Sequence, residues 1–501
     1  MQANFVVLGS RDVFWKQQSN LNNSVGTWFP LALGVIAVVL AGIIGGMLTS
    51  LVAGLAIAFV VLNEPRYGLY LVAVAIAADP AAYDPLTEPT RRLYLGFAGF
   101  PATPIELLIL WTGICWIIRS LAESKLELPS ATVFWTSIAF SLLLAGAIFN
   151  GVNRGGDFTI ALWETRALLA VPPLMLITCG LLRERRHVVE LVCVALGAIT
   201  LMSLELVWRY FALVRQGAFN DELESAFNHD GAMLVALLSV AGMAAVFWGP
   251  NKLAKLLGLA ICVFAFIVVL TSRRRAALVG IEAGIIALAV VMLITNWRRF
   301  AFYAPIVAVL GVLYLAAFWN NGNALGQPAR VFRTVFISDS ASTRDRSSDE
   351  YRAVEKYNLW AGVKAMPLRG HGFGVPYPKP LPMADLSSFW PFWDYIAHNT
   401  VLWLWHKGGV FTFMTFWFLV GTAITEGVRM ARRVRTPLLT AIIGGIFAYL
   451  VMTVMFAYVD LGLASTRPML LFGICLGLLF AMERIWHSDL RPVSAGLEGR
   501  T

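Results

Sequence analysis

Three consecutive arginines interrupt an otherwise apolar part of the chain: Arg273, Arg274 and Arg275 follow Ser272 and precede two alanines. A guanidinium at a membrane boundary is costly to desolvate unless it binds an anion or reaches back to water. Arginine keeps its charge there and forms paired hydrogen bonds to phosphate oxygens. The cluster therefore favours an anion site with a lipid-linked pyrophosphate as its partner, and the alternative is a set of interfacial anchors.

Other polar candidates lie in one hydrophilic segment, 320–397, and at the start of the apolar run that follows it. Two arginines there could extend the anion site or could be solvated loop charges. A neutral imidazole at the boundary could accept a proton from a sugar hydroxyl, or it could cap a helix. His398 is the first choice for that imidazole, with His371 and His406 as alternatives. The candidates in this part of the chain are Arg352, Arg369, His371, His398 and Asn399.

Two earlier segments could line the same site. Arg166 lies near the start of an apolar run, and Glu164 beside it is expected to pair either with Arg166 or with Arg154. A purely structural ion pair would explain this group equally well. Residues 228–230, Asn-His-Asp, begin another apolar run. They could line the same cavity or cap a helix. No spacing of His, Cys, Asp or Glu predicts a metal site, and no cofactor is implied.

The elements that must position these residues are membrane-spanning helices. The chain is 58% hydrophobic, its mean hydropathy is +0.71, and its apolar runs have the length of about 17–25 residues that crosses a bilayer. We expect an all-α polytopic bundle of about 12–14 spans in a lipid bilayer. The predicted spans are 28–45, 46–62, 67–79, 104–119, 130–149, 161–182, 188–212, 229–248, 253–271, 276–296, 300–319, 398–424, 437–457 and 468–485. The first run follows a polar segment, so no cleavable signal peptide is expected.

Basic residues orient these spans. If the N-terminus is cytoplasmic, six basic connections fall inside, as the positive-inside rule requires. The net charge of +9 is then explained by cytoplasmic Lys and Arg, and no nucleic acid is expected as a partner. The same register places the arginine triplet and segment 320–397 outside. The expected division is membrane helices in 1–319, a large outer loop in 320–397, further membrane helices in 398–485 and a cytoplasmic tail in 486–501.

The outer loop is expected to contain a helix. Ser347 followed by Glu350 is a capping-box pattern, which predicts a helix from about Ser348 to Met366. Its spacing would place Arg352 and Glu355 near one face. A proline then ends the helix, and residues 369–374 form a flexible Gly-rich turn. No strand precedes this turn, so a dinucleotide-binding fold is rejected.

These motifs, in this order, resemble the O-antigen ligase and polymerase family of bacterial membrane proteins. The family is recognised by a Ser-Arg-x-Ala motif that opens a transmembrane helix, and Ser272–Ala277 matches it with an extra arginine. A large periplasmic loop follows, in which an arginine, here Arg352, precedes a Pro-x-x-Gly-x-Gly-x-Gly element, here Pro367–Gly374. A His-Asn pair, here His398-Asn399, closes the loop.

The resemblance implies a metal-independent glycosyltransferase of the bacterial inner membrane whose active site faces the periplasm. Its donor would be a glycan on undecaprenyl pyrophosphate, and its acceptor would be lipid A-core, as in lipopolysaccharide synthesis, or another glycan chain. By the resemblance, His398 and Arg352 would carry out catalysis. The donor pyrophosphate would be held by Ser272, Arg273, Arg274, Arg275, Arg352 and Arg166. Arg369, His371 and Asn399 would lie on the acceptor side.

The resemblance covers about residues 160–425 and includes one departure. A Gly pair follows the His-Asn motif, and Lys407 stands before it where relatives often carry Glu. The acceptor side is therefore expected to differ from that of lipopolysaccharide ligases. We favour a ligase, with an exopolysaccharide polymerase as the alternative. A lipid-linked oligosaccharide flippase is the competing class, but Glu205 and Glu282 are isolated and no pair of related halves is apparent.

Overall fold

The computed structural model describes residues 47–78, 93–95, 101–215, 228–272, 274–321, 324–336, 343–388, 390, 392–434 and 436–486. Every regular element in these ranges is a helix, and eleven of the helices are long and apolar enough to cross a membrane. The predicted all-α membrane fold is therefore confirmed. The predicted span 28–45 and Arg273 lie outside the described residues.

The eleven long helices follow the predicted spans closely. They are α5 (Pro104–Ala122), α6 (Ala131–Asn153), α7 (Phe158–Leu181), α8 (Arg185–Arg215), α9 (His229–Trp248), α10 (Lys252–Ser272), α11 (Arg275–Thr295), α12 (Trp297–Phe318), α15 (Thr400–Arg433), α16 (Pro437–Val459) and α17 (Thr466–Ile485). Shorter elements are α2 (Met47–Asn63), α3 (Arg66–Ala77), the 3-10 turn η1 (Ala324–Gly326), α13 (Gln327–Phe336) and α14 (Thr343–Ala365). The predicted short span at 67–79 is α3, whose 12 residues are too few for a bilayer of about 30 Å.

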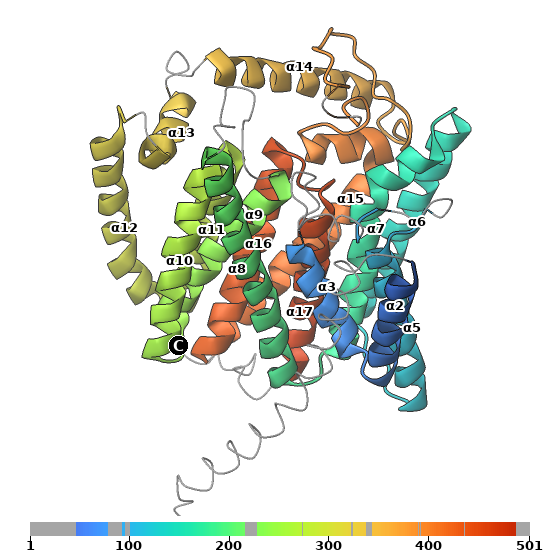
Figure 1. Ribbon diagram of the computed structural model, residues 1–501, viewed down its shortest axis with the longest axis horizontal. Helices are drawn as coiled ribbons and strands as arrows, with labels where there is room; N and C mark the ends of the chain where they lie inside the picture. Colours follow the sequence, from blue (N-terminus) through green and yellow to red (C-terminus); the bar gives the residue numbers. More distant parts are fainter. Residues whose placement is uncertain are drawn as a thin grey trace, which may run out of the picture.

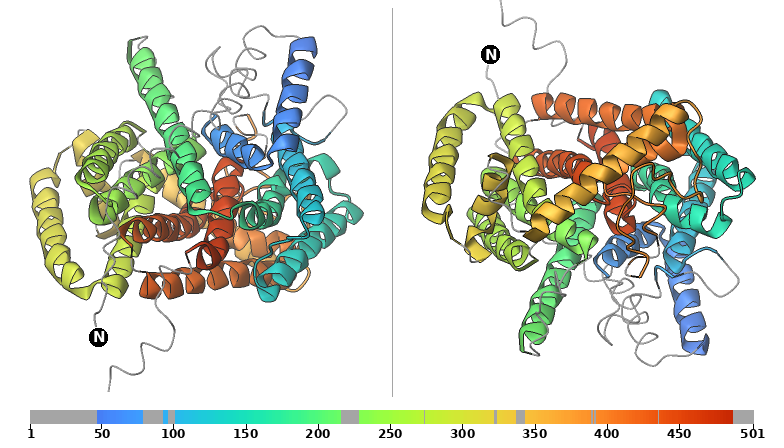
Figure 2. Two further views of the ribbon diagram at one scale, coloured as in Figure 1. Left: turned by 90° about the horizontal axis from the view of Figure 1, so that it is seen from below. Right: turned by 90° about the horizontal axis from the view of Figure 1, so that it is seen from above.

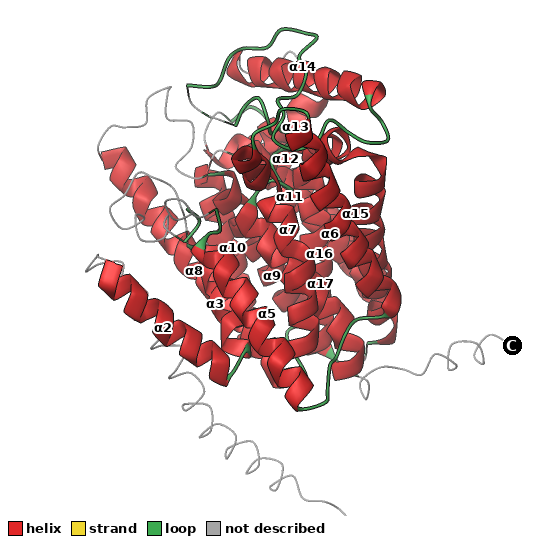
Figure 3. Cartoon of the chain, turned by 90° about the vertical axis from the view of Figure 1, so that its right-hand side faces the viewer, coloured by secondary structure: helices red, strands yellow, loops and turns green. Residues whose placement is uncertain are grey.

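The long helices stand side by side, and α14 lies across one end of the bundle (Figures 1 and 3). The view from that end shows α14 running diagonally over the helices below it (Figure 2). At the centre, 78% of the apolar window of α17 and 72% of that of α9 are buried within the protein, whereas α12 has no buried residue and flanks the bundle. The end that carries α14 is called the α14 end below, and the opposite end is called the far end.

The loop helix begins earlier than predicted. Helix α14 starts at Thr343, so Ser347 and Glu350 lie within its first two turns rather than at a capping box. The sequence from Thr343 onward contains few helix breakers, and the helix continues through the capping motif because nothing there stops it. Its end at Ala365, just before Pro367, agrees with the prediction.

The Gly-rich turn is held tightly, which corrects the expectation that it is flexible. Gly370, Gly372 and Gly374 all have positive φ angles, which residues with a side chain rarely adopt. A Cβ atom on Gly372 would lie 2.3 Å from the Cα of Gly151 in α6. The amide of Gly372 donates to the carbonyl of Lys407 at 2.9 Å. The turn therefore wedges the outer loop between α6 and α15 and leaves this amide unavailable to a phosphate.

Candidate active site

A chain of polar contacts connects three separate helix ends at the α14 end. Arg274, which precedes α11, places Nη1 3.1 Å from Nε2 of His229 at the start of α9. The other ring nitrogen of His229, Nδ1, lies 2.8 Å from a carboxylate oxygen of Asp460, which follows α16. The arginine motif is therefore anchored to a buried acid through a histidine.

This geometry assigns the protonation of His229. An arginine Nη can only donate a hydrogen bond, so Nε2 of His229 must accept from Arg274. Nδ1 then carries the proton and donates it to Asp460. Burial would raise the pKa of Asp460, but the contact with His229, together with the positive charge of Arg352, holds it below its ordinary value. Asp460 is therefore an ionised carboxylate inside the site.

A second pair is built where α14 crosses the start of α15. Glu355 on α14 is 1% exposed, and one of its carboxylate oxygens accepts from the backbone amide of His398 at 2.8 Å. The other carboxylate oxygen lies 3.2 Å from Nδ1 of the His398 ring. A carboxylate can only accept, so Nδ1 carries the proton, and Nε2 of His398 is left with a lone pair. That arrangement suits a general base.

Arg352 lies one helical turn before Glu355 on α14. Its Nε is buried and has no hydrogen-bond partner, an unfavourable state for a donor unless a ligand completes it. Its charge acts on Asp460, so the two residues face the same region. Tyr351 contacts the ring of His398 edge-on at 6.0 Å. Burial, followed by the charge of Glu355, raises the pKa of Tyr351 to about 12, so its hydroxyl remains a donor.

Three further predicted residues lie at this site with structural partners. The Ser272 hydroxyl is buried, donates to the carbonyl of Val269 at 2.6 Å and accepts from the amide of Arg274 at 3.2 Å. Arg275 is engaged by Asp349 on α14 at 2.9 Å, which fastens that helix to α11. The Asn399 side chain accepts from the amide of Leu402 and caps α15.

The other predicted loop residues lie apart from this cluster. Arg369 is exposed. His371 stacks on His406 with ring centroids 4.3 Å apart, and its Nε2 lies 3.1 Å from the carbonyl of Gly362. Gly362 is seven residues beyond Glu355 on α14, about 10 Å along a helix axis. Burial, with a further contribution from Arg154, lowers the pKa of His371 despite its bond to Gly362, so the ring is neutral.

Arg166 lies below the aromatic part of the loop. Its guanidinium stacks 3.9 Å from the Trp163 ring centroid and lies 3.8 Å from the Glu106 carboxylate. Its Nε and Nη1 are buried without hydrogen-bond partners. Trp163 contacts Phe392, and Trp390 two residues earlier contacts His398. The loop therefore covers both Arg166 and His398.

The expected pairing of Glu164 with Arg166 or Arg154 is wrong. Glu164 pairs with Lys407 at 2.7 Å, and both side chains are fully buried. The candidates Arg166 and Arg154 are near Glu164 in sequence, whereas α15 supplies the actual partner from far along the chain. Lys407 is thus neutralised inside the bundle beneath the Gly-rich turn and does not face an acceptor. Position 407 thus carries Lys in place of the Glu of many relatives, and Glu164 on α7 supplies the opposite charge.

Several residues of the site escaped the sequence prediction. Asp460 and Arg467 lie in or next to a short loop that carries no recognisable motif. Arg467 is 1% exposed. It donates to the Asn228 side chain at 3.0 Å and lies 3.5 Å from the Asp230 carboxylate. Asn228 also caps α9, so the helix-cap prediction is confirmed. The sequence offered one signal for them: Asp460 and Arg467 flank a loop that is predicted to lie on the outer side.

Sequence comparison identifies the region that supplies most of this geometry. Residues 260–417 match the family model described as O-antigen ligase. The match covers less than half of the chain and supports membership of the O-antigen ligase and polymerase family. The matched region contains Arg274, Arg352, Glu355 and His398, whereas Asp460 lies beyond it. The chain of contacts described above therefore extends beyond the matched region. Among curated proteins, no match was found.

Proposed function

We propose that the chain transfers a glycan from undecaprenyl pyrophosphate to an acceptor hydroxyl at the periplasmic face of a bacterial inner membrane. The family match supports a membrane enzyme of the ligase or polymerase type. The observation that supports the finer proposal is that Arg352, whose Nε has no partner, and His398, oriented by Glu355, both lie near Asp460, which Arg274 reaches through His229. Anion-binding and proton-accepting groups thus meet at one end of the bundle.

The proposed chemistry is a single displacement. The acceptor oxygen attacks the anomeric carbon while the bond from that carbon to the pyrophosphate oxygen breaks. Nε2 of His398 takes the hydroxyl proton, and Glu355 stabilises the imidazolium that forms. Arg352 and Arg274 stabilise the charge that develops on the departing polyprenyl pyrophosphate, a role that guanidiniums can fill without a metal ion. Inversion at the anomeric carbon follows from one displacement.

A purified-protein assay tests this proposal. Protein supplied with an undecaprenyl-pyrophosphate glycan and an acceptor glycan is expected to release undecaprenyl pyrophosphate in chelator-treated buffer. Arg352→Ala is expected to lower the rate at least about 10²-fold because it removes a transition-state contact. Arg369→Ala, an exposed arginine in the same loop, is the matched control and should retain activity. Equal activity of the two variants would reject the role of Arg352.

The same assay separates the alternatives. A ligase adds one glycan to lipid A-core, whereas an exopolysaccharide polymerase produces a ladder of products from lipid-linked chains. We favour the ligase. A flippase would move the lipid-linked oligosaccharide across liposomes with no covalent product. Glu205, one of the two acids considered in that context, pairs with Arg209 at 2.9 Å and is not an isolated charge.

A further inference from the structure

A second polar site lies at the far end of the bundle, away from the candidate active site. A cavity of about 220 Å³ opens where the turn between α2 and α3 meets the ends of α5, α7 and α8. A single water needs only about 10–15 Å³ of such space, so the cavity can hold a small ligand group. It is lined by Glu64, Arg66, Trp116, Arg119, Ser120, Gly180, Leu181, Arg183, Glu184 and His187.

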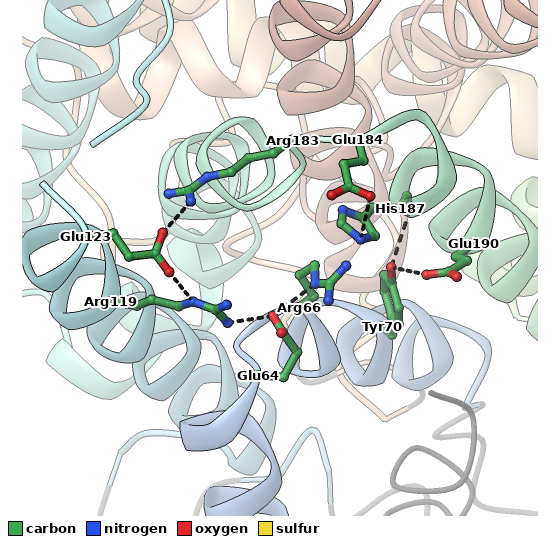
Figure 4. A network of polar contacts seen from close by, with 9 residues as sticks. All are labelled: Glu64, Arg66, Tyr70, Arg119, Glu123, Arg183, Glu184, His187 and Glu190. Atoms are coloured by element: carbon green, nitrogen blue, oxygen red, sulfur yellow. Dashed lines mark hydrogen bonds and ion pairs between the residues drawn. The ribbon is translucent and has the colours of Figure 1, made fainter. Parts of the chain in front are cut away.

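The acidic groups around this cavity already contact basic side chains: Glu64 and Glu123 contact arginines, and Glu184 contacts His187 (Figure 4). Glu64 accepts from Nε of Arg66 and from Nη1 of Arg119, both at 2.9 Å. Glu123 accepts from Nε of Arg119 at 2.8 Å and also from Arg183. Arg66 meets Glu64 through Nε alone, so its two Nη groups have no partner among the described residues. Arg66 and Arg119 bind the same oxygen of Glu64, Oε1, so its Oε2 accepts from neither of them, and the two Nη groups of Arg66 add a larger number of donors to the lining.

Three buried polar atoms of the lining residues also lack partners. They are Nε1 of Trp116, the hydroxyl of Ser120 and Nδ1 of His187. Trp116 is 6% exposed and Ser120 is 1% exposed, so water at the protein surface does not satisfy them. The indole can only donate. Buried donors that lack an acceptor are rare in folded proteins unless a bound group supplies one.

The indole is held in place by the backbone of α7. A Cβ atom on Gly180 would lie 2.4 Å from Cε2 of Trp116 and 2.5 Å from its Nε1. The ring thus packs directly on the glycine, and its N–H is fixed at the cavity wall. A fixed indole donor, a buried hydroxyl and the spare guanidinium donors of Arg66 form a lining that is complementary to an anion with several acceptor oxygens.

We propose that this cavity binds a phosphate group, supplied by the headgroup of an anionic phospholipid. In the lining of this cavity, hydrogen-bond donors without a partner outnumber acceptors without a partner. The lining therefore favours an anion with several acceptor oxygens. Basic pockets between membrane helices at a bilayer surface suit lipid headgroups, and the far end is the predicted cytoplasmic side. The site does not depend on the glycan-transfer proposal, because no active-site residue takes part in it.

Lipid retention in native mass spectrometry tests the site. The protein is placed in phosphatidylcholine nanodiscs with or without phosphatidylglycerol, and the phosphatidylglycerol that stays bound is counted. Arg66→Gln is expected to weaken retention about tenfold and Trp116→Phe about fivefold, as for charged and neutral donors respectively. Arg186→Gln is the matched control, because Arg186 pairs with Glu190 at 2.7 Å and does not line the cavity.

Inorganic phosphate distinguishes the two sources of the anion. If millimolar phosphate displaces phosphatidylglycerol and raises the melting temperature in a way that Trp116→Phe abolishes, soluble phosphate is the ligand. If it does neither, the headgroup is the ligand, and phosphate recognition holds in both cases. Trp116→Phe removes only an N–H, so it keeps the test valid should Arg66→Gln unfold. Equal retention by the wild type, both cavity variants and the control, with no phosphate effect, would overturn the proposal.

Discussion

Glu355 carries the most informative contacts in the molecule at the scale of single residues. It is almost fully buried, and it binds both the backbone amide and the ring Nδ1 of His398. A buried carboxylate needs such compensation, and the compensation fixes one ring tautomer. The base in the proposed reaction is therefore His398 as oriented by α14, so the outer loop contributes to the chemistry as well as to substrate access.

Glu355→Gln tests this arrangement. An amide can still accept from Nδ1 but cannot stabilise an imidazolium, so kcat is expected to fall about 10²-fold while the donor KM changes little. His398→Ala should lower kcat at least as much, and the double variant should be no slower than His398→Ala. Steady-state rates of polyprenyl pyrophosphate release measure both parameters.

The control for this series lies on the same helix. Glu350→Gln changes an exposed acid and should leave kcat unaltered. Additive losses in the Glu355→Gln/His398→Ala double variant would mean that the two residues act independently, and the orienting role would have to be abandoned. A lowered melting temperature with unchanged kcat would assign Glu355 to loop docking alone.

Sequence reasoning at this scale identified residues but not their partners. Arg274, Arg352 and His398 stand out because charged groups are conspicuous beside apolar runs. Glu355 and Asp460 do not, because their significance comes from which helix ends meet. Arg275 shows the converse: its type and position suggest anion binding, but Asp349 on α14 occupies it. The proposed roles of Arg274, Arg352 and His398 remain predictions.

The buried pair between α7 and α15 is the clearest feature at the scale of elements. Glu164 and Lys407 are both fully buried and 2.7 Å apart, and the amide of Gly374 also donates to Glu164. The same pair therefore joins two membrane helices to the Gly-rich turn. Gly409 has a φ of 75° and interrupts α15 just beyond Lys407, and this kink lets the helix pass beneath the turn.

Lys407→Met is expected to destabilise the protein by about 3–5 kcal/mol, because it leaves a buried carboxylate without its counter-charge. Adding Glu164→Gln should recover most of that loss. Breaking the Arg433–Glu483 pair by Arg433→Gln is the comparison; Glu483 is 43% exposed, and about 0–1 kcal/mol is expected. Thermal unfolding in detergent measures all three variants. A Lys407→Met protein as stable as the wild type would show that the pair does not hold the turn.

Element boundaries were largely predictable because apolar length dictates them in a membrane protein. Helix α9 has the predicted bounds, and α16 differs from the prediction by two residues at its end. The predicted start of α14 is wrong because this helix lies outside the apolar runs and only a local capping pattern indicates where it begins. The glycine content of residues 369–374 predicts a flexible turn because it reports conformational freedom, whereas tight packing against α6 decides its state.

For the whole molecule, the organising fact is that segments far apart in sequence converge at one end. His229, Arg274, Glu355, His398 and Asp460 come from five separate segments and are joined by direct contacts or by charge. A second, independent charged network occupies the far end (Figure 4). The two ends thus differ: at one end α14 contributes Arg352 and orients His398 through Glu355, and the other end surrounds a donor-lined cavity.

The orientation of these ends decides whether the α14 end can meet a periplasmic acceptor. Six basic connections predict that the far end is cytoplasmic, so a thiol at the α14 end should react from outside.

Ser387→Cys lies in the exposed part of the outer loop, and Ser124→Cys lies in an exposed turn at the far end. A membrane-impermeant maleimide is expected to label Ser387→Cys in cells with a permeabilised outer membrane, and Ser124→Cys only after lysis. Wild-type protein measures the background from the native cysteines, of which Cys193 is exposed and Cys262 is half-buried, and this background is subtracted. The reverse labelling pattern would place His398 in the cytoplasm, where no periplasmic glycan could reach it, and the proposed transfer would fail.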